Sequence, residues 1–296
     1  MKCKKLVTSL LMIVCILTLT GCQKGEKKDL KDKVNQEISY MSVNLISLCN
    51  QLNNISFENY YTTTEEVVKD PGSSANISGN SMESSSKKMS QEESKNSNQN
   101  EVSGSESNNI RITSIKSKRI LGEDHSQVNW TGLQSDLEIF YSTWNSIIMD
   151  LYQIGAKDQD ILNFSTKLDD VILRVKEKNK ADSLTLLADL YQLIPNFMRA
   201  YSENNTMIQL QETRAHILVA YANLEKKDWN VVNDQVQKAE DSFQNVMGDV
   251  DFIHQKNYHV NKTYVSLKEL QNSIKLKDAD LFFIKYKNFM EEINLL

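Results

Sequence analysis

Histidine and carboxylate side chains at helical spacing are the first candidates for chemistry in this sequence. Asp251 and His254 are three residues apart, a spacing that carboxylate-bridged metal bundles use, but those sites need a second such pair and two further glutamates. Glu212 and His216, four apart, would share one helix face and could hold a metal or form an ion pair. His254 and His259 are five apart and would point to different faces. We therefore expect no metal site.

Catalytic motifs are equally hard to find. No Ser, Asp or Glu stands in a recognisable nucleophile or general-base context, and the 9 glycines show no phosphate-loop spacing. Trp130, Trp144 and Trp229 could line a ligand pocket, but aromatic residues at helical spacing more often belong to a core. The sequence thus predicts a protein that is not an enzyme, with no catalytic residue and no cofactor.

The first 22 residues carry a targeting pattern. Three lysines stand among the first five residues, and an apolar run then continues to Thr20, too short to span a bilayer comfortably. The run ends in Leu19, Thr20, Gly21 and Cys22, which are a branched aliphatic residue, a small polar one, a small one and a cysteine. This pattern resembles the lipobox of bacterial lipoproteins, and the resemblance covers residues 1–22 only.

The resemblance implies a lipid anchor. In that family the thiol receives a diacylglycerol and the chain is cut before the cysteine. Here the cut would fall between Gly21 and Cys22, and Cys22 would become the acylated mature N-terminus. Each buried methylene of a diacylglycerol or palmitate chain contributes roughly 0.8 kcal/mol to membrane binding. The alternative is an ordinary cleaved signal peptide that is followed by a chance cysteine.

Charge and cysteine usage constrain the mature chain further. Loss of residues 1–21 removes three lysines and no acid, which changes the formal charge from −5 to −8. This acidic balance argues against nucleic acid as a partner. Cys3 and Cys15 leave with the signal and Cys22 would be acylated, so Cys49 is the only remaining thiol and no intrachain disulfide can form. We expect Cys49 to be a buried small hydrophobe.

Composition divides the mature chain into segments. Residues 22–33 have the character of a polar tether. Apolar residues then recur in alternating steps of four and three, which predicts an amphipathic helix over 34–60. Residues 61–110 are rich in Ser and Asn and too poor in apolar residues to order themselves, so we expect a disordered linker. Residues 111–296 are expected to form an all-helical domain.

Helix boundaries in this domain are marked by recurring polar residues. Thr131 and Gln134 have the spacing of a capping box, and Pro195 should kink a helix near Tyr191. Helix breaks recur about every 24 residues, often with Lys at the end of one helix and Asp as the N-cap of the next. The expected breaks are Lys157-Asp158, Ala181-Asp182, Asn204-Asn205, Lys227-Asp228, residues 254–257 and Lys277-Asp278.

Short turns between helices of about 20 residues force neighbouring helices to run antiparallel. The predicted fold class is therefore all-α, an antiparallel helical bundle or a stack of helical hairpins, with a long disordered insertion near the N-terminus. The hairpins are distantly similar to tetratricopeptide-like repeats, although the small-residue positions and terminal Pro of that repeat are absent. The narrow apolar stripes favour a compact bundle over an open superhelix.

The helix predicted over 34–60 needs a partner surface, because alone in water it would expose its whole apolar seam. We expect it to dock on the C-terminal domain. The alternative is a coiled coil between molecules, with the linker as a stalk.

The expected function is binding at the cell surface. We expect a non-enzymatic lipoprotein, held on the extracytoplasmic face of a bacterial cell membrane through Cys22, whose helical domain binds another protein or a polymer. The alternative is a small-molecule or metal-binding lipoprotein with a pocket between helices. A hydrolase acting on the cell wall has no residue to support it.

Overall fold

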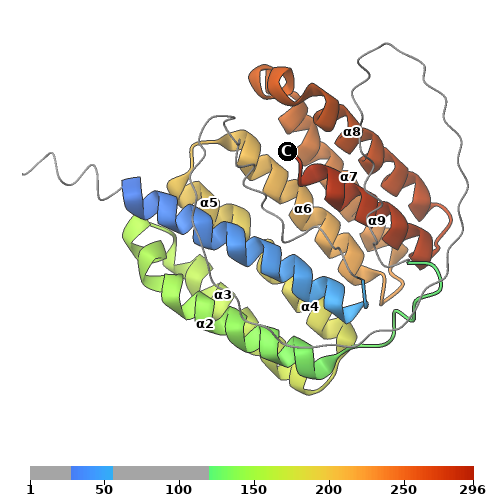
Figure 1. Cartoon of the computed structure of the whole chain (residues 1–296), viewed down its shortest axis with the longest axis horizontal. Coiled ribbons are helices and arrows are strands. Elements are labelled where there is room, and N and C mark those ends of the chain that lie inside the picture. The colour runs from blue at the N-terminus through green and yellow to red at the C-terminus, as the bar shows by residue number, and fades with distance from the viewer. Residues whose placement is uncertain (1–27, 56–119) are drawn as a thin grey trace, which may run out of the picture. The chain divides into compact units, whose positions relative to one another are not determined.

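The computed structural model describes residues 28–55 and 120–296, and these are mostly helical, with no strand among them (Figure 1). The predicted all-α fold is confirmed. The predicted signal peptide, Cys22 and the linker predicted over 61–110 lie outside the described residues. The helices are an N-terminal helix over 28–52, α2 (Trp130–Ile154), α3 (Asp158–Lys176), α4 (Lys180–Tyr191), α5 (Ile194–Tyr201), α6 (Asn205–Asn223), α7 (Trp229–Met247), α8 (Val250–Ile274) and α9 (Ala279–Ile293).

The helices from α2 onward form a stack in which neighbours in the chain are also neighbours in space. Contacts join α2 to α3, α3 to α4, α4 to α6, α6 to α7, α7 to α8 and α8 to α9. Helix α6 also contacts α9, so α6, α7, α8 and α9 close into a ring of four helices. The predicted stack of helical hairpins is confirmed, and its second half closes as a bundle does.

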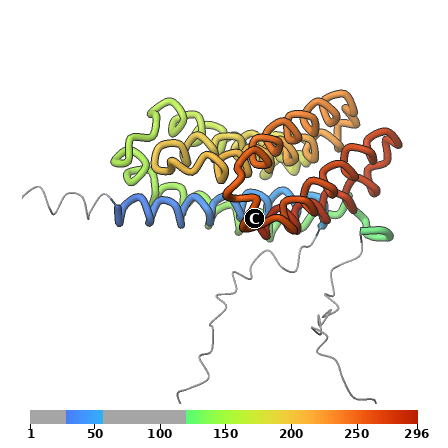
Figure 2. The backbone as a smooth tube through the Cα atoms, turned by 90° about the horizontal axis from the view of Figure 1, so that it is seen from above, coloured from blue at the N-terminus to red at the C-terminus, as the bar shows by residue number. Residues whose placement is uncertain are grey.

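The N-terminal helix lies on this stack, in blue between α2 and α6 in Figure 1 and along one face of the stack in Figure 2. The expected docking on the C-terminal domain is thus observed. The helix begins at residue 28, so it includes part of the segment predicted as a polar tether, and it ends at 52. Its predicted seam is buried throughout: Val34, Ile38, Met41, Leu45, Leu48, Leu52 and Ile55.

Buried polar contacts fix the position of the N-terminal helix. The Ser42 hydroxyl donates to the Tyr191 hydroxyl of α4 at 2.9 Å, and Tyr191 in turn donates to Oε1 of Gln211 on α6 at 2.6 Å. Further along, the Tyr286 hydroxyl of α9 donates to Oδ1 of Asn50 at 3.2 Å. A sliding of the helix along its seam would leave these groups buried and unpaired, which costs free energy. The polar contacts therefore select one register.

The N-terminal helix runs antiparallel to α2. Near its beginning, Lys33 Nζ lies 2.5 Å from Oδ2 of Asp150, close to the end of α2. Beyond its last turn, the carbonyl oxygen of Asn53 lies 2.9 Å from Nδ1 of His125, just before α2 begins. Residues 56–119 therefore leave and rejoin the described fold at one end, and residue 28 lies at the opposite end.

The start of α2 differs from the prediction. Asn129 is the N-cap, and its side chain accepts a hydrogen bond from the Gly132 backbone N–H. The capping box predicted at Thr131 is wrong, because Thr131 is already the second residue of the helix. Asn and Thr are both good N-caps, so the choice between neighbouring candidates depends on where the chain enters the helix.

Aspartate caps are present at two of the four predicted positions. Asp228 and Asp278 cap α7 and α9 by accepting from backbone N–H groups, as expected. Asp158 is instead the first residue of α3, and Asp182 lies in the first turn of α4. Asn179 caps α4 by accepting from the Asp182 N–H. An acidic residue is favourable throughout the first helical turn, which explains why its presence marked the right region but not the cap.

The break predicted at 254–257 lies inside α8. Asp249 is the N-cap of this helix and accepts from the Phe252 N–H, so the true break is several residues earlier. The helix is nevertheless irregular where the break was predicted, because Lys256 has φ −123° and ψ 22°. The polar segment therefore produces a kink and does not end the helix.

Pro195 ends one helix and begins another. Helix α4 stops at Tyr191, and Pro195 lies in the first turn of α5. A proline in a first turn needs no N–H partner, so this position accommodates it without loss of a helical hydrogen bond. Gln192 and Leu193, between the two helices, keep right-handed helical dihedral angles, so the helix is interrupted where the kink was predicted, near Tyr191.

A repeated turn connects helices at the end where residues 56–119 attach. After α3, α6 and α8, a lysine adopts the left-handed conformation and the N-cap of the next helix follows directly. This conformation brings Cβ close to the following carbonyl oxygen and costs roughly 1–2 kcal/mol in a residue other than glycine. The lysines are Lys178 (φ 56°), Lys227 (φ 54°) and Lys277 (φ 51°).

Replacement of Lys227 by glycine should stabilise the protein. We expect Lys227→Gly to raise the free energy of unfolding by about 0.5–1 kcal/mol, because glycine has no Cβ to strain at positive φ. Lys226→Gly is the matched control, since its φ is not positive and glycine there relieves no strain; it adds flexibility to the unfolded chain and removes only a long, exposed ion pair with Asp182. Urea unfolding of the full chain measures both. Equal effects of the two substitutions would contradict this account.

Loss of one seam side chain should destabilise the whole fold if the N-terminal helix is docked as described. Leu45 is fully buried, and we expect Leu45→Ala to lower the free energy of unfolding by about 2–4 kcal/mol. Tyr40 on the same helix is 49% exposed, so Tyr40→Ala should change stability far less. Chemical denaturation of the full chain, followed by circular dichroism, tests the pair. An unchanged transition for Leu45→Ala would show that the helix is not part of the fold.

Candidate functional site

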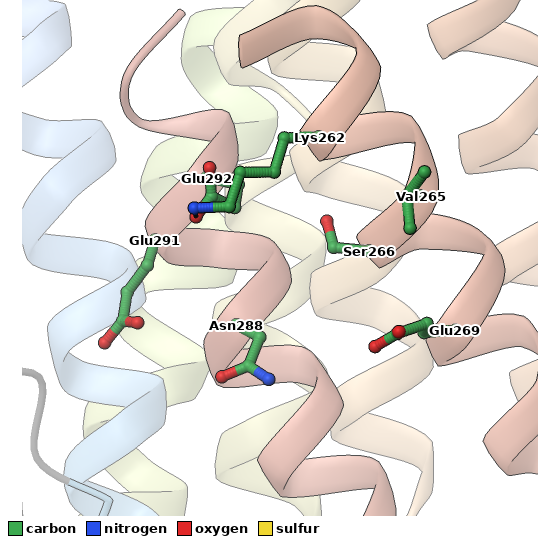
Figure 3. A pocket seen from close by; sticks show the side chains of 7 residues that line it. All are labelled: Lys262, Val265, Ser266, Glu269, Asn288, Glu291 and Glu292. Carbon is green, nitrogen blue, oxygen red and sulfur yellow. Dashed lines mark ion pairs between the residues drawn. The ribbon is translucent and has the colours of Figure 1, made fainter. Parts of the chain in front are cut away.

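A cleft of about 350 Å³ opens between α8 and α9 (Figure 3). Side chains of α8 form one wall and side chains of α9 form the other, with Glu291 pointing away from α8. The cleft lies on the last helical hairpin and is therefore open on the outer surface of the stack. The lining residues are Lys262, Val265, Ser266, Glu269, Asn288, Glu291 and Glu292.

A second, smaller cleft of about 230 Å³ continues along the same pair of helices toward the turn between them. Glu269 lines both clefts, so they form one groove, which we call the α8–α9 groove. Leu276, 69% exposed, lies at its far end. The other residues that line the second cleft are Asn272, Ser273, Leu281 and Lys285.

Small serines on α8 create the depth of the groove. Ser266 and Ser273 are almost completely buried. Their hydroxyls donate to the carbonyl oxygens of Thr263, at 2.8 Å, and Leu270, at 2.6 Å, within the same helix. Because these hydroxyls are already engaged and have no neighbouring base among their hydrogen-bond partners, they do not form a nucleophile of the Ser–His kind.

Two ion pairs cross the groove. Lys262 Nζ on α8 lies 2.5 Å from Oε1 of Glu292 on α9, and Lys285 Nζ on α9 lies 2.7 Å from Oε2 of Glu269 on α8. The hydrogen bond with Glu292 raises the pKa of Lys262, so this lysine stays charged at any physiological pH. Both pairs are partly exposed, so each contributes little to stability.

The carboxylates of Glu291 and Glu292 are both partly withdrawn from solvent. Burial raises the pKa of Glu291, and Lys287, whose Nζ is 3.8 Å away, only partly opposes this effect. Oε2 of Glu292 is buried and has no hydrogen-bond partner among the described residues. This corner of the groove therefore favours a ligand that donates hydrogen bonds or brings positive charge.

The histidine and acidic side chains considered as metal ligands do not gather around one point in the described part of the chain. Glu212 pairs with Arg199, and Nδ1 of His216 lies 2.9 Å from Oε1 of Gln235. Asp251 and His254 lie in the first turns of α8, before the kink at Lys256. Within 28–55 and 120–296, no group of three or more His, Cys, Asp or Glu side chains is arranged to hold a metal ion.

Trp144 is a core residue. It is fully buried, and its Nε1 donates to the Ser165 hydroxyl at 2.9 Å. The centroid of its ring lies 4.1 Å from the ring centroid of Phe164. Trp130 and Trp229 are partly buried against the same core. The three tryptophans therefore pack the interior of the fold and do not line the α8–α9 groove.

Cys49 is fully buried on the docked face of the N-terminal helix. Burial raises the pKa of its thiol, so the reactive thiolate is disfavoured. This environment agrees with the predicted role as a small hydrophobe.

The lipobox residues Leu19, Thr20, Gly21 and Cys22 lie outside the described residues. None of the helices in the described part of the chain is both long and apolar enough to cross a membrane. Comparison with known proteins found no matching family model, no matching curated protein and no matching solved structure.

The α8–α9 groove was not predicted from the sequence, although the sequence contains a signal for it. Tyr258 and Val265 are spaced so that they share one face of α8, whereas the buried Val260 and Leu267 lie on the opposite face. A helix with apolar residues on two faces has more apolar surface than one neighbouring helix can cover.

Neutralisation of Glu291 should stabilise the fold in a pH-dependent way. Because its pKa is raised, the folded state disfavours the charged carboxylate, and this penalty is fully present above the raised pKa. We expect Glu291→Gln to raise the melting temperature at pH 7, by an amount that vanishes as the pH falls below about 4, where the wild-type carboxyl is protonated in both states. Thermal melts of both chains from pH 3.5 to 8 measure the difference, and a constant difference would refute the assignment.

Proposed function

We propose that this chain is a non-enzymatic lipoprotein, anchored through Cys22 to the extracytoplasmic face of a bacterial cell membrane, whose helical domain binds another protein or a polymer. The targeting pattern of residues 1–22 supports the anchor. The two clefts of the groove support binding over catalysis, because their charged side chains are paired with one another and their serines donate within their own helix.

The position of residue 28 is the observation that carries the proposal. Because the N-terminal helix is docked on the stack, only the chain from Cys22 to residue 28 can separate the domain from the lipid. Six residues reach about 20 Å at full extension. The end of the stack that carries residue 28 therefore stays near the bilayer, and a partner reached by this domain lies close to the membrane.

Replacement of Cys22 should release the chain from the membrane. Serine offers no thiol to an acyl transferase, so we expect Cys22→Ser to lose incorporation of labelled fatty acid and to move from the membrane fraction to the soluble fraction. Cys15→Ser is the matched control, since Cys15 lies within the apolar run and should leave both properties unchanged. Detergent extraction of bacterial membranes compares the variants. Retention of the Cys22 variant to the same degree as wild type would refute the anchor.

A small-molecule carrier is the second candidate, and the volume of the larger cleft favours it, since about 350 Å³ falls within the range of ligand pockets. A thermal-shift screen of the full chain separates the two candidates. A carrier should show a melting temperature that rises steadily with the concentration of one compound.

A further inference from the structure

The outer face of α8 is uncovered in the described part of the chain. On one side α8 is joined to α7 through Lys268 and Glu240, and on the other side it packs against α9. Between these contacts, Tyr258 is 68% exposed, Val265 is 57% exposed and Leu276 is 69% exposed. At 1.5 Å per residue, Tyr258 and Val265 lie about 10 Å apart on one face of α8, and Leu276 follows in the turn beyond the end of the helix. Tyr258 and Val265 are one heptad apart, so they form a short apolar seam that a second helix can cover.

The charges beside this seam are arranged with an unusual symmetry. At the level of Lys262, the positive charge lies on α8 and the negative charge, Glu292, lies on α9. At the level of Glu269, the negative charge lies on α8 and the positive charge, Lys285, lies on α9. The two levels are equally far from the midpoint between Val265 and Ser266. A half-turn about that midpoint therefore superimposes each positive charge on a negative one.

We propose that a second copy of this chain docks on this face, with the two α8 helices antiparallel around a two-fold axis near Val265. Lys262 of one copy then meets Glu269 of its partner, and the reciprocal pair forms on the other side of the axis. The four groups Glu292, Lys262, Glu269 and Lys285 alternate in sign across each half of the interface. Such a self-complementary patch is the defining property of an isologous dimer.

The smaller cleft of the α8–α9 groove also fits this arrangement. Tyr258 and Ser273 lie at equal distances along the chain from the same midpoint, so the exposed ring of Tyr258 from one copy lies over Ser273 of the other. Ser273 is buried and small, and the cleft of about 230 Å³ beside it provides space for an aromatic side chain. A chance partner of different sequence would not require this internal match of charges and shapes, and for that reason the geometry points to a second copy.

The interface is small. One face of a single helix buries less area than a stable complex of standard size, so we expect a dissociation constant on the order of micromolar or weaker. The dimer is independent of the lipid anchor, because it is formed by α8 and α9 alone. Confinement of the chain to a membrane surface would only raise the effective concentration of the two copies.

A charge-swap experiment tests the dimer. Sedimentation equilibrium of the full chain in density-matched non-ionic detergent, over a range of concentrations, gives the dissociation constant. We expect Lys262→Glu and Glu269→Lys each to weaken dimerisation at least tenfold, and the double variant to recover part of this loss, because it restores the pair between copies but leaves like charges beside Glu292 and Lys285 within each copy. The control is Lys238→Glu combined with Asp234→Lys, an exposed pair on α7, which should change nothing.

A second variant avoids the ion pairs altogether. Val265→Asp places two like charges at the two-fold axis and alters only an exposed side chain, so it should abolish the dimer and leave the melting temperature within a few degrees of wild type. A chain that stays monomeric at all concentrations, or a dimer that withstands Val265→Asp and both single swaps, would overturn the proposal. Because Cys22→Ser can be measured in the same assay, failure of the anchor and failure of the dimer are distinguishable.

Discussion

The N-terminal helix buries its apolar seam against the stack. Apart from this helix, α2 to α5 meet α7 to α9 mainly through α6, which contacts both groups. Hydrogen bonds join this helix to Tyr191 of α4 and Tyr286 of α9, and an ion pair joins it to Asp150 of α2. A helix of this kind draws little stability from its own backbone in water, so packing must supply it. The stack in turn needs the helix, because Tyr191 of α4, Tyr221 of α6 and Tyr286 of α9 all hydrogen-bond to it and would lose these partners without it.

Apolar periodicity was sufficient to predict the class of fold and the docking of the N-terminal helix, because burial of a regular stripe admits few solutions. The exact helix ends were harder to predict, since they depend on competition between neighbouring polar residues. Asn129, and not Thr131, is the N-cap of α2. Asp249 is the N-cap of α8, and the polar segment before Asn257 only bends this helix at Lys256. In each case several residues could perform the same role, and tertiary packing decided which one did.

The candidate site was predicted less well than the fold. The lipobox-like pattern of residues 19–22 is local and can be proposed without a structure, whereas the α8–α9 groove depends on which face of α8 remains uncovered after packing. Val265 and Glu269 are four residues apart and look like ordinary surface positions in the sequence. Only the three-dimensional arrangement shows that Lys262 and Glu269 hold partners of opposite charge on α9. Pairing between helices is not encoded in the spacing within one helix.

The long segment between the N-terminal helix and α2 has little effect on the docking of that helix. The contact of Asn53 with His125 brings the two attachment points of residues 56–119 to one end of the stack. The entropy cost of closing such a connection grows only logarithmically, by about 0.6 kcal/mol for each doubling of its length. Burial of even one large apolar side chain contributes more than that. The length of the insertion is therefore free to vary, while the register set by Ser42 and Asn50 keeps residue 28, and with it the end that the proposed anchor would hold, in a fixed place on the domain.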